Sequence, residues 1–370
     1  MRDNMDIGHV ETEKLLRKLE RTISKEYAIA EQEVKEKLDA YLEKFRAKDE
    51  LKRKALKNGL ITQTEYDQWR IQQILVSDRW ISLSNTLAAE YAQAAQIARL
   101  IAFDGMPEIY ALNYNFGMYM CDALSGGILA DSFVLYNRDA VIHLFKGGEF
   151  YHGPGKKTTL AIQTGKQIAW DKKQIQSVMT QGLLQGESIP KLSSRLAATV
   201  GESDRKAAIR NTRTMATGVQ NAGRVDSFKR SNEIAEKYGM KVRKQWFATL
   251  DGRTRHWHAE LDGEIVDNDE PFVNEYGEID YPGDPGAEPA NVYNCRCTCV
   301  SVIEGAGLNN SAHPKDTGRV MGKDLEGISY EEWKAGHYQQ HSDRITKQDE
   351  IAETMRKYYS AEYKKYKNLQ

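Results

Sequence analysis

The stretch WFATLDGRTRHWHAELDGEIV, residues 246–266, differs from the Lys- and Glu-rich chain on either side of it. It contains a polar cluster of ionisable side chains, namely Asp251, Arg253, Arg255, His256, His258 and Asp262. One interpretation is a reactive centre, because general base catalysis requires a histidine beside a carboxylate. The other is structural, because an Asp-Gly turn followed by arginines is typical of a carboxylate that accepts backbone and guanidinium hydrogen bonds.

The residues around this polar cluster predict a small antiparallel sheet. After Gly239, KVRKQWFATL alternates apolar and polar positions as a strand does. Asp-Gly turns at Asp251 and Asp262 bracket the cluster, and EIV is expected to return as a second strand. YNCRCTCVSVI, residues 293–303, is expected to close the unit as a final strand. The segment 267–290 is rich in Gly, Pro and acidic residues and is expected to be a loop.

Long amphipathic helices are predicted in the N-terminal part of the chain. Apolar side chains recur at spacings of three and four over residues 11–57, and Asn58-Gly59 provides a stop. TQTE at 62–65 matches a capping box, which predicts a second helix running to about Ala102. Each helix needs a partner for its apolar face, either the other helix or another subunit, so we expect an assembly surface here.

The middle of the chain is expected to be largely helical. Residues 105–165 are rich in aromatics and glycine and predict mixed helix and short strands, with a turn through KGGEFYHGPGKK. One helix is expected to begin at Asp171 and end near Gly186. A longer helix is expected over 203–238, and a further helix-like stretch at the C-terminus.

Together these patterns predict an α+β fold, with long N-terminal helices followed by a helical lead-in and a small antiparallel β-containing domain. Three regions are expected. Residues 1–165 form a helical or mixed assembly region, residues 166–304 form the domain that contains the sheet, and residues 305–370 form a tail with a helix.

Charge is balanced, with 52 Lys and Arg against 53 Asp and Glu in 370 residues. This balance implies no general attraction to DNA or membranes, although local Lys and Arg clusters at 229–244 and 364–367 suit nonspecific phosphate contacts. No apolar run approaches the roughly 18 residues that a membrane span needs, and the N-terminus lacks a secretory signal. We therefore expect folding in a cytoplasm and no membrane partner.

Three of the four cysteines lie close together, which is not a disulfide framework. Cys295 and Cys297, with or without a third thiolate from Cys299, and either His258 or His256 would form the kind of set that zinc binds tetrahedrally. In a regular strand, however, C-x-C-x-C places three side chains in a row, so metal binding requires a bend. The alternative is that these cysteines are small core residues in a reducing cytoplasm.

Arg213, Thr214 and Asn221 lie on one face of the predicted helix over 203–238. This face either docks against the polar cluster, with Arg213 and Asp251 as a buried ion pair, or is solvated. The chain has no Gly-rich phosphate loop and no G-x-S-x-G or HExxH motif to complete an active site. The structural interpretation of the cluster is therefore favoured.

The pattern W-x-A-T-L-D-G-R-T-R-x-x-H-x-x-L-D-G at 246–263, with P-x-x-x-x-N-C-R-C at 289–297, resembles the phage Mu F-like head-morphogenesis domain. This family comprises minor head proteins of tailed phages and prophages. The resemblance covers about residues 170–340, including the preceding helices and the later GISYEEWKAG. The family's signature falls on Trp246, Asp251, Arg253, Thr254, His258, Leu261, Gly263, Asn294, Cys295, Arg296 and Cys297, with Arg213 in the lead-in.

Two departures from the family bear on the site. Many members have Arg-Thr-Glu where this chain has Arg213-Thr214-Met215, which weakens an enzymatic interpretation. Some members carry paired cysteines where this chain has Arg255 and His258, and a Cys-to-His exchange is one that a zinc ligand tolerates. No catalytic residue and no other cofactor is expected, and a structural zinc at Cys295, Cys297 and His258 is the metal hypothesis.

The resemblance implies a minor capsid protein that acts in head morphogenesis and is not an enzyme. The expected partner is the phage portal protein, with scaffold or major capsid protein and packaged DNA as further partners. The expected location is the virion, in the head interior or at the portal vertex, after assembly in the bacterial cytoplasm, with an influence on DNA packaging or ejection. The alternatives are a metal-dependent nuclease or other DNA-acting enzyme, an ADP-ribosyltransferase toxin, and a non-enzymatic DNA-binding accessory protein. About 70 residues follow Cys299, too few for a toxin domain, so none is expected there.

Overall fold

The computed structural model describes residues 6–73, 78–135, 137–144, 160–185, 187, 189–305 and 329–340, and a few positions between 342 and 354. Contacts divide the chain into two compact units. Unit 1 comprises Met1–Glu20, Ile101–Lys157 and Arg210–Gln370, and unit 2 comprises Arg21–Leu100 and Thr158–Ile209. Each unit combines segments that are distant along the chain. The three consecutive regions expected from the sequence stay a prediction.

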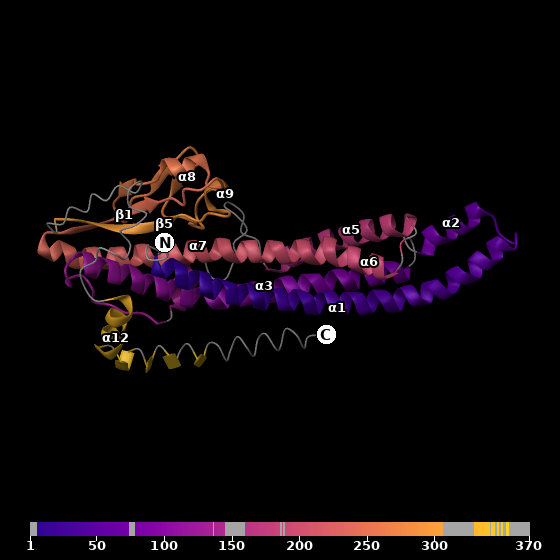
Figure 1. The fold of residues 1–370 in the computed structure, drawn as a ribbon, viewed down its shortest axis with the longest axis horizontal. Helices are drawn as coiled ribbons and strands as arrows, with labels where there is room; N and C mark the ends of the chain where they lie inside the picture. Colours follow the sequence, from indigo (N-terminus) through magenta and orange to yellow (C-terminus); the bar gives the residue numbers. More distant parts are fainter. Residues whose placement is uncertain are drawn as a thin grey trace. The chain divides into compact units, whose positions relative to one another are not determined.

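Unit 2 is built from helices (Figure 1). It contains most of α1 (Ile7–Lys57), all of α2 (Gln63–Ile71) and the first half of α3 (Asp78–Leu124). Parts of α5 (Leu160–Leu184) and α7 (Glu202–Ala235), with α6 (Ile189–Leu196) and a π-helical turn η2 (Ala197–Gly201), complete it.

The apolar stripe of α1 is buried within this chain. Its buried members in unit 2 are Ile23, Tyr27, Ala30, Val34, Leu38 and Leu42, spaced by three and four residues. On α3, Leu87, Ala88 and Tyr91 are buried, and Lys37 of α1 forms an ion pair with Glu90 of α3. The partner of this amphipathic helix is thus another helix of the same chain.

The prediction for residues 58–124 was partly wrong. Thr62 and Glu65 do form the capping box, but α2 ends at Ile71, and α3 then runs from Asp78 to Leu124. The mixed helix and strand expected after Gly105 is therefore helix, continuing past Pro107. A Cβ on Gly105 would lie 2.7 Å from Leu19 Cδ1, so this glycine permits close packing and does not end the helix.

Further along, α4 (Arg138–Leu144) is helical, and the described part of 105–165 contains no strand. KGGEFYHGPGKK and the C-terminal stretch after 354 lie outside the described residues. The helix expected to begin at Asp171 begins earlier, at Leu160, and Asp171 is buried inside it. The end of α7 is as expected, since η3 (Glu236–Tyr238) follows it and Gly239 has a φ of 69°.

Unit 1 contains the predicted antiparallel sheet, in the order β2-β1-β5. β1 (Lys241–Phe247) pairs with both β2 (Ile265–Val266) and β5 (Thr298–Glu304). Trp246 on β1 faces Cys299 on β5 across the register. The loop expected at 267–290 also holds a hairpin, β3 (Phe272–Asn274) and β4 (Gly277–Ile279), which the prediction missed. The α+β class is confirmed.

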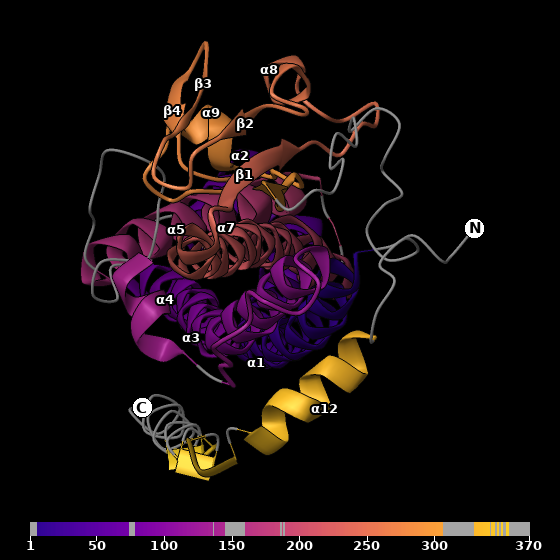
Figure 2. The ribbon, with the colours of Figure 1, turned by 90° about the vertical axis from the view of Figure 1, so that its left-hand side faces the viewer.

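Within unit 1, α7 lies between the sheet and the second half of α3 (Figures 1 and 2). Trp246, Phe272, Cys299 and Phe228 are buried together on the sheet side of α7. On the other side, Tyr110 of α3 donates a 2.5 Å hydrogen bond to Asp226 of α7. The apolar contacts of α7 on both sides fix the position of the sheet relative to the helices of unit 1.

Short helices complete unit 1. They are α8 (His256–Glu260) in the polar cluster, α9 (Pro289–Val292) before the cysteines, and α12 (Tyr330–Gln340) in the tail. Trp333 of α12 is buried against Tyr119 and Phe133, and its Nε1 donates to Asp122 of α3 at 3.0 Å. The described part of the GISYEEWKAG sequence therefore packs onto α3 through Trp333.

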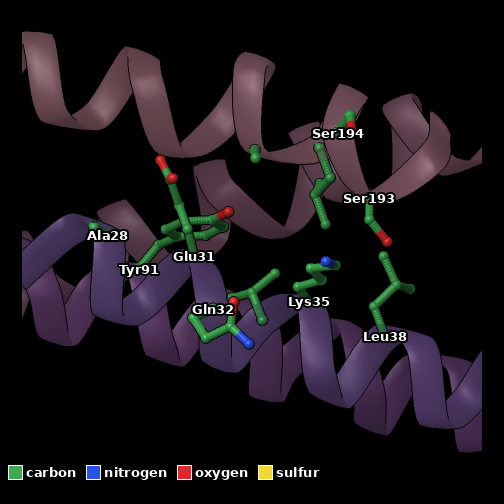
Figure 3. A pocket seen from close by; sticks show the side chains of 11 residues that line it. Ala28, Glu31, Gln32, Lys35, Leu38, Tyr91, Ser193 and Ser194 are labelled. Atoms are coloured by element: carbon green, nitrogen blue, oxygen red, sulfur yellow. The ribbon is translucent and has the colours of Figure 1, made fainter. Parts of the chain in front are cut away.

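Unit 2 contains a hollow of about 230 Å³ beside α1 (Figure 3). Glu31 and Lys35 of α1, Tyr91 of α3 and Ser193 of α6 are among the side chains that line it. Burial, together with the neighbouring Glu202 carboxylate, raises the pKa of Glu31. None of the described helices is both long and apolar enough to span a membrane.

Candidate functional site

The loop that carries the polar cluster is closed at its base by backbone pairing. Trp246 N donates to Glu264 O, and Gly263 N donates to Trp246 O, both at 2.9 Å. Asp262 Oδ1 accepts from Ala248 N at 2.9 Å. Gly263 has a φ of 89°, a conformation that a side chain at this position would strain. The sequence LDG thus fixes the end of the loop.

Asp251 holds the tip of the loop onto the segment that carries the cysteines. Its carboxylate accepts from Arg296 Nη1 at 2.5 Å and from Arg296 Nη2 at 2.6 Å. It also accepts from Arg253 N at 2.9 Å and from the Thr254 hydroxyl at 3.3 Å. The hydrogen bonds from Arg296, with that from Arg253 N, hold the pKa of Asp251 well below its usual range.

Two further contacts join the loop to the same segment. The Thr249 hydroxyl donates to Arg296 O at 2.6 Å, and Arg255 donates to Tyr293 O. The Arg253 side chain is 81% exposed, and its guanidinium lies 3.8 Å from the carboxylate of Asp251 within the same loop. His256 is likewise exposed and lies 3.1 Å from Glu275. Two members of the cluster, Asp251 and Arg255, therefore join the loop to the cysteine segment by hydrogen bonds.

His258, Cys295 and Cys297 come together beneath this loop. His258 Nδ1 lies 3.6 Å from Cys295 Sγ and 3.7 Å from Cys297 Sγ, and all three side chains are buried. The ligand atoms of the three residues all lie within 4.8 Å of one another. The imidazole stands edge-on to Trp246, with ring centroids 5.4 Å apart. The structure thus brings together the three residues of the metal hypothesis.

The two thiols interact closely enough to titrate as a pair. A hydrogen bond with Cys295 lowers the pKa of Cys297 to about 5, with a further contribution from His258. The same interaction and burial raise the pKa of Cys295 well above its usual value. The hydrogen bond between the two sulfurs thus favours a single negative charge on the pair.

The polar face of α7 fixes the backbone of this cysteine segment. Thr217 donates to Cys295 O at 3.1 Å, and Asn221 donates to Cys297 O at 3.2 Å. Asn221 Oδ1 accepts from Cys299 N at 2.9 Å. The Thr214 hydroxyl accepts from Asn294 N at 3.3 Å. The helix face for which docking on the polar cluster and exposure to solvent were the two alternatives instead packs on residues 294–299.

The Arg213–Asp251 ion pair considered from the sequence was wrong. Arg213 pairs with Glu13 at 3.1 Å and with Glu20, both on α1. The partner of Asp251 is Arg296, at 2.5 Å. The sequence could not assign these arginines to their partners, because Glu13 lies 200 residues from Arg213 and Asp251 lies 45 residues from Arg296.

Arg224 is a structural residue that the sequence analysis missed. It is 1% exposed, donates to Asn113 Oδ1 at 3.1 Å and to Thr298 Oγ1 at 2.9 Å, and lies 2.6 Å from Asp6. Its guanidinium also stacks over Phe116, 5.3 Å from the ring centroid. Its position in the sequence, one turn after Asn221 on the same helix face, could have indicated that it contacts the same segment.

A hollow of about 730 Å³ lies beside the cysteines within unit 1. Arginines from three segments contribute to its lining, together with Cys295 and Cys297. Its lining residues are His9, Thr12, Glu13, Leu16, Arg213, Thr217, Gln220, Thr249, Arg253, Arg255, Asn294, Cys295, Arg296 and Cys297. The sulfurs therefore border a polar space that water or a small anion can enter.

Comparison with known proteins gives a match over the segment that carries this site. Residues 173–300 match the family model described as Phage Mu protein F like protein. The minor head protein GP7 of Bacillus phage SPP1 is 35% identical over 137 residues, which are 35% of this chain and 41% of that protein. The NAD(+)–arginine ADP-ribosyltransferase EFV of Enterococcus faecalis is 32% identical over 165 residues, which are 44% of this chain and 31% of that protein.

No solved structure matches the chain. The chain spans less than half the length of the two curated relatives. The resemblance to the Mu F-like family is confirmed for the matched segment. The role of the signature residues, including the metal hypothesis, stays a prediction.

Proposed function

Because residues 173–300 form a domain of the phage Mu protein F-like family, we propose that the chain is a minor capsid protein of a tailed phage or prophage. It joins the head during assembly, contacts the portal protein, and in that position influences DNA packaging or ejection. The observation that carries the proposal is the family match, supported by the similarity to a protein named as a minor head protein.

The geometry of the polar cluster supports a structural role. Asp251, Thr249 and Arg255 each bind residues 293–296, and Asp262 caps the loop base. A general base must lie within hydrogen-bonding distance of the substrate proton that it removes. These groups instead hydrogen-bond to other residues of the same domain. We therefore propose that the cluster has a structural role in a head protein and does not catalyse a reaction.

The proposed portal contact lies at the hairpin of α1 and α2. The apolar stripes of the long helices are buried within the chain, so they do not offer the assembly surface that the sequence suggested. Leu51, near the end of α1, and Leu60, in the connection between α1 and α2, are 67% and 75% exposed. Large apolar side chains held in water at the end of a helical hairpin suit a protein contact.

The test is co-purification of the full chain with its cognate portal protein. The double variant Leu51→Asp/Leu60→Asp is expected to lose portal binding while its helical circular dichroism and Tm stay unchanged. Ile29→Asp is the matched control, because Ile29 is an exposed apolar residue of the same helix about 30 Å before Leu51. Equal portal binding by both variants would place the contact elsewhere, and no binding by the unmodified chain would remove the portal from the proposal.

The relative named as an ADP-ribosyltransferase motivates one competing function. Incubation of the full chain with labelled NAD⁺ and an arginine-containing acceptor is expected to give no transfer above a boiled control. Divalent-dependent cleavage of DNA would favour a nuclease instead. DNA binding that falls steeply with salt, without portal binding, would favour an accessory DNA-binding protein.

A further inference from the structure

We propose that His258, Cys295 and Cys297 bind one zinc ion within unit 1. Neither the family match nor the relatives' names assign a metal to this chain, and the inference does not depend on the proposed function. It rests on the positions of three buried side chains from two separate segments.

The distances fit a metal centre. With Zn–S bonds of about 2.3 Å and Zn–N bonds of about 2.05 Å, tetrahedral angles place sulfur and nitrogen roughly 3.6 Å apart. His258 Nδ1 lies 3.6 Å and 3.7 Å from the sulfurs of Cys295 and Cys297. All three pairs of ligand atoms are within 4.8 Å, so small side-chain adjustments bring the set around one ion.

The backbone supplies the bend that a C-x-C pair requires. Asn294 has a φ of 57°, the left-handed conformation, immediately before Cys295. Cys295 and Cys297 precede β5, which begins at Thr298, so they are not part of its regular ladder. Hydrogen bonds from Thr217 and Asn221 to the carbonyls of Cys295 and Cys297 hold this conformation. Cys299, which faces Trp246 in the sheet, is not part of the group.

The histidine is held in place by aromatic packing. Trp246 and Trp257 both stand edge-on to His258, with centroid distances of 5.4 Å and 6.3 Å. His258 Nε2 is buried and has no hydrogen-bond partner among the described residues. A metal-bound histidine commonly donates this second N–H to an acceptor, and here the two indoles take over the orienting role.

The fourth ligand comes from the adjacent hollow. Cys295 and Cys297 line that hollow, so a water molecule or a small anion can complete the tetrahedron. Two thiolates with one imidazole favour zinc over magnesium, calcium or manganese, which prefer oxygen ligands. Arg255 lies three residues before His258, which is the spacing between ligands in many structural zinc sites.

The test is metal analysis of the full chain, purified under reducing conditions without an affinity metal. We expect about one zinc per chain, and cobalt substitution should give thiolate charge-transfer and tetrahedral d–d absorption. Cys297→Ser is expected to lose most of the zinc and the charge-transfer band. Cys121→Ser is the matched control, because Cys121 is equally buried in unit 1 but outside the group, and it should keep both.

A second variant separates metal binding from folding. Arg255→Cys would place a third thiolate three residues before His258, and it is expected to tighten zinc binding by tenfold or more and to intensify the cobalt charge-transfer band. The proposal is overturned if the unmodified, folded chain with four reactive thiols takes up neither zinc nor cobalt. It is also overturned if Cys297→Ser and Cys121→Ser bind zinc equally.

Discussion

Asp251 accepts hydrogen bonds from both terminal nitrogens of Arg296, at 2.5 and 2.6 Å, and so fastens the loop between β1 and β2 to the segment that leads into β5. The same two segments are also joined by hydrogen bonds from Thr249 and Arg255 and by a shared apolar cluster. The Asp251–Arg296 pair therefore joins the two segments of unit 1 that carry the family signature.

Breaking this pair should loosen the loop. Asp251→Ala and Arg296→Ala should each lower the Tm and increase hydrogen exchange over residues 249–262. The double variant should be no worse than Asp251→Ala alone, because both substitutions remove the same ion pair and only Asp251→Ala also removes the hydrogen bonds from Arg253 and Thr254. The paired carboxylate titrates below its usual range, so the contribution of Asp251 is present above about pH 4 and is lost as the pH falls further. Additive effects of the two substitutions would contradict a shared role.

The buried Arg224 should matter more than an exposed arginine on the same helix. Arg224→Leu is expected to lower the free energy of unfolding by about 3–5 kcal/mol, because it leaves Asp6 and several acceptors unpaired. Arg230→Leu is the control, since Arg230 is 44% exposed and pairs with Asp131 at the surface. Its effect should be about 0–1 kcal/mol. Denaturant unfolding of both variants measures the difference, and similar losses would show that burial of Arg224 is not decisive.

The helix prediction succeeded where an apolar period was long and uninterrupted. The stripe of α1 and the capped start of α2 follow from local sequence, and β1, β2 and β5 follow from alternation and Asp-Gly turns. It failed at Gly105 and Pro107, where burial of Met106 and Ile109 maintains the helix despite poor local residues. Tertiary packing outweighed propensity at that point.

The site could be predicted only in part. The residues of the polar cluster and of the cysteine group were recognisable, because a family signature places them at fixed positions. The partners of Arg213 and Arg224 were not, because Glu13 and Asp6 lie about 200 residues away along the chain. Ion pairs between such distant segments depend on how the helices pack, which no local pattern encodes.

A close approach of two glycines gives another prediction. A Cβ added to Gly218 of α7 would lie 2.4 Å from the backbone oxygen of Gly283. Gly218→Ala should therefore push the 281–286 turn away from the helix and destabilise the protein by about 1–3 kcal/mol. Gly252→Ala is the control, because a Cβ there meets nothing within 4 Å, and it should change stability by less than about 0.5 kcal/mol. Equal Tm values for the two variants would argue against this packing.

Unit 2 should become less stable as the pH rises. Asp171 and Asp204 both accept from Gln167, at 2.8 and 3.2 Å. Burial, together with the charge of Asp204, raises the pKa of Asp171 to about 8, and burial raises that of Asp204 to about 6. Because these values exceed the unfolded value of about 4, the stabilisation is full below pH 4 and is lost as the pH rises to about 8.

Replacing one of these carboxyl groups should remove most of this pH dependence. Asp171→Asn is expected to unfold at a higher temperature than the unmodified chain at pH 8–9, with a gap that narrows toward pH 5. Asp269→Asn, at an exposed position, is the control and should follow the unmodified chain throughout. Thermal unfolding across this pH range measures the difference in Tm. A difference between Asp171→Asn and the unmodified chain that does not change with pH would contradict the destabilisation expected from the raised pKa values.

The most direct test of the central claim is quantitative mass spectrometry of purified heads from the phage or induced prophage that encodes this chain. The account predicts that its peptides copurify with heads, in far fewer copies than the major capsid protein, and that Asp251→Ala lowers their amount. Heads that assemble with normal composition and infectivity but contain none of this chain would contradict it.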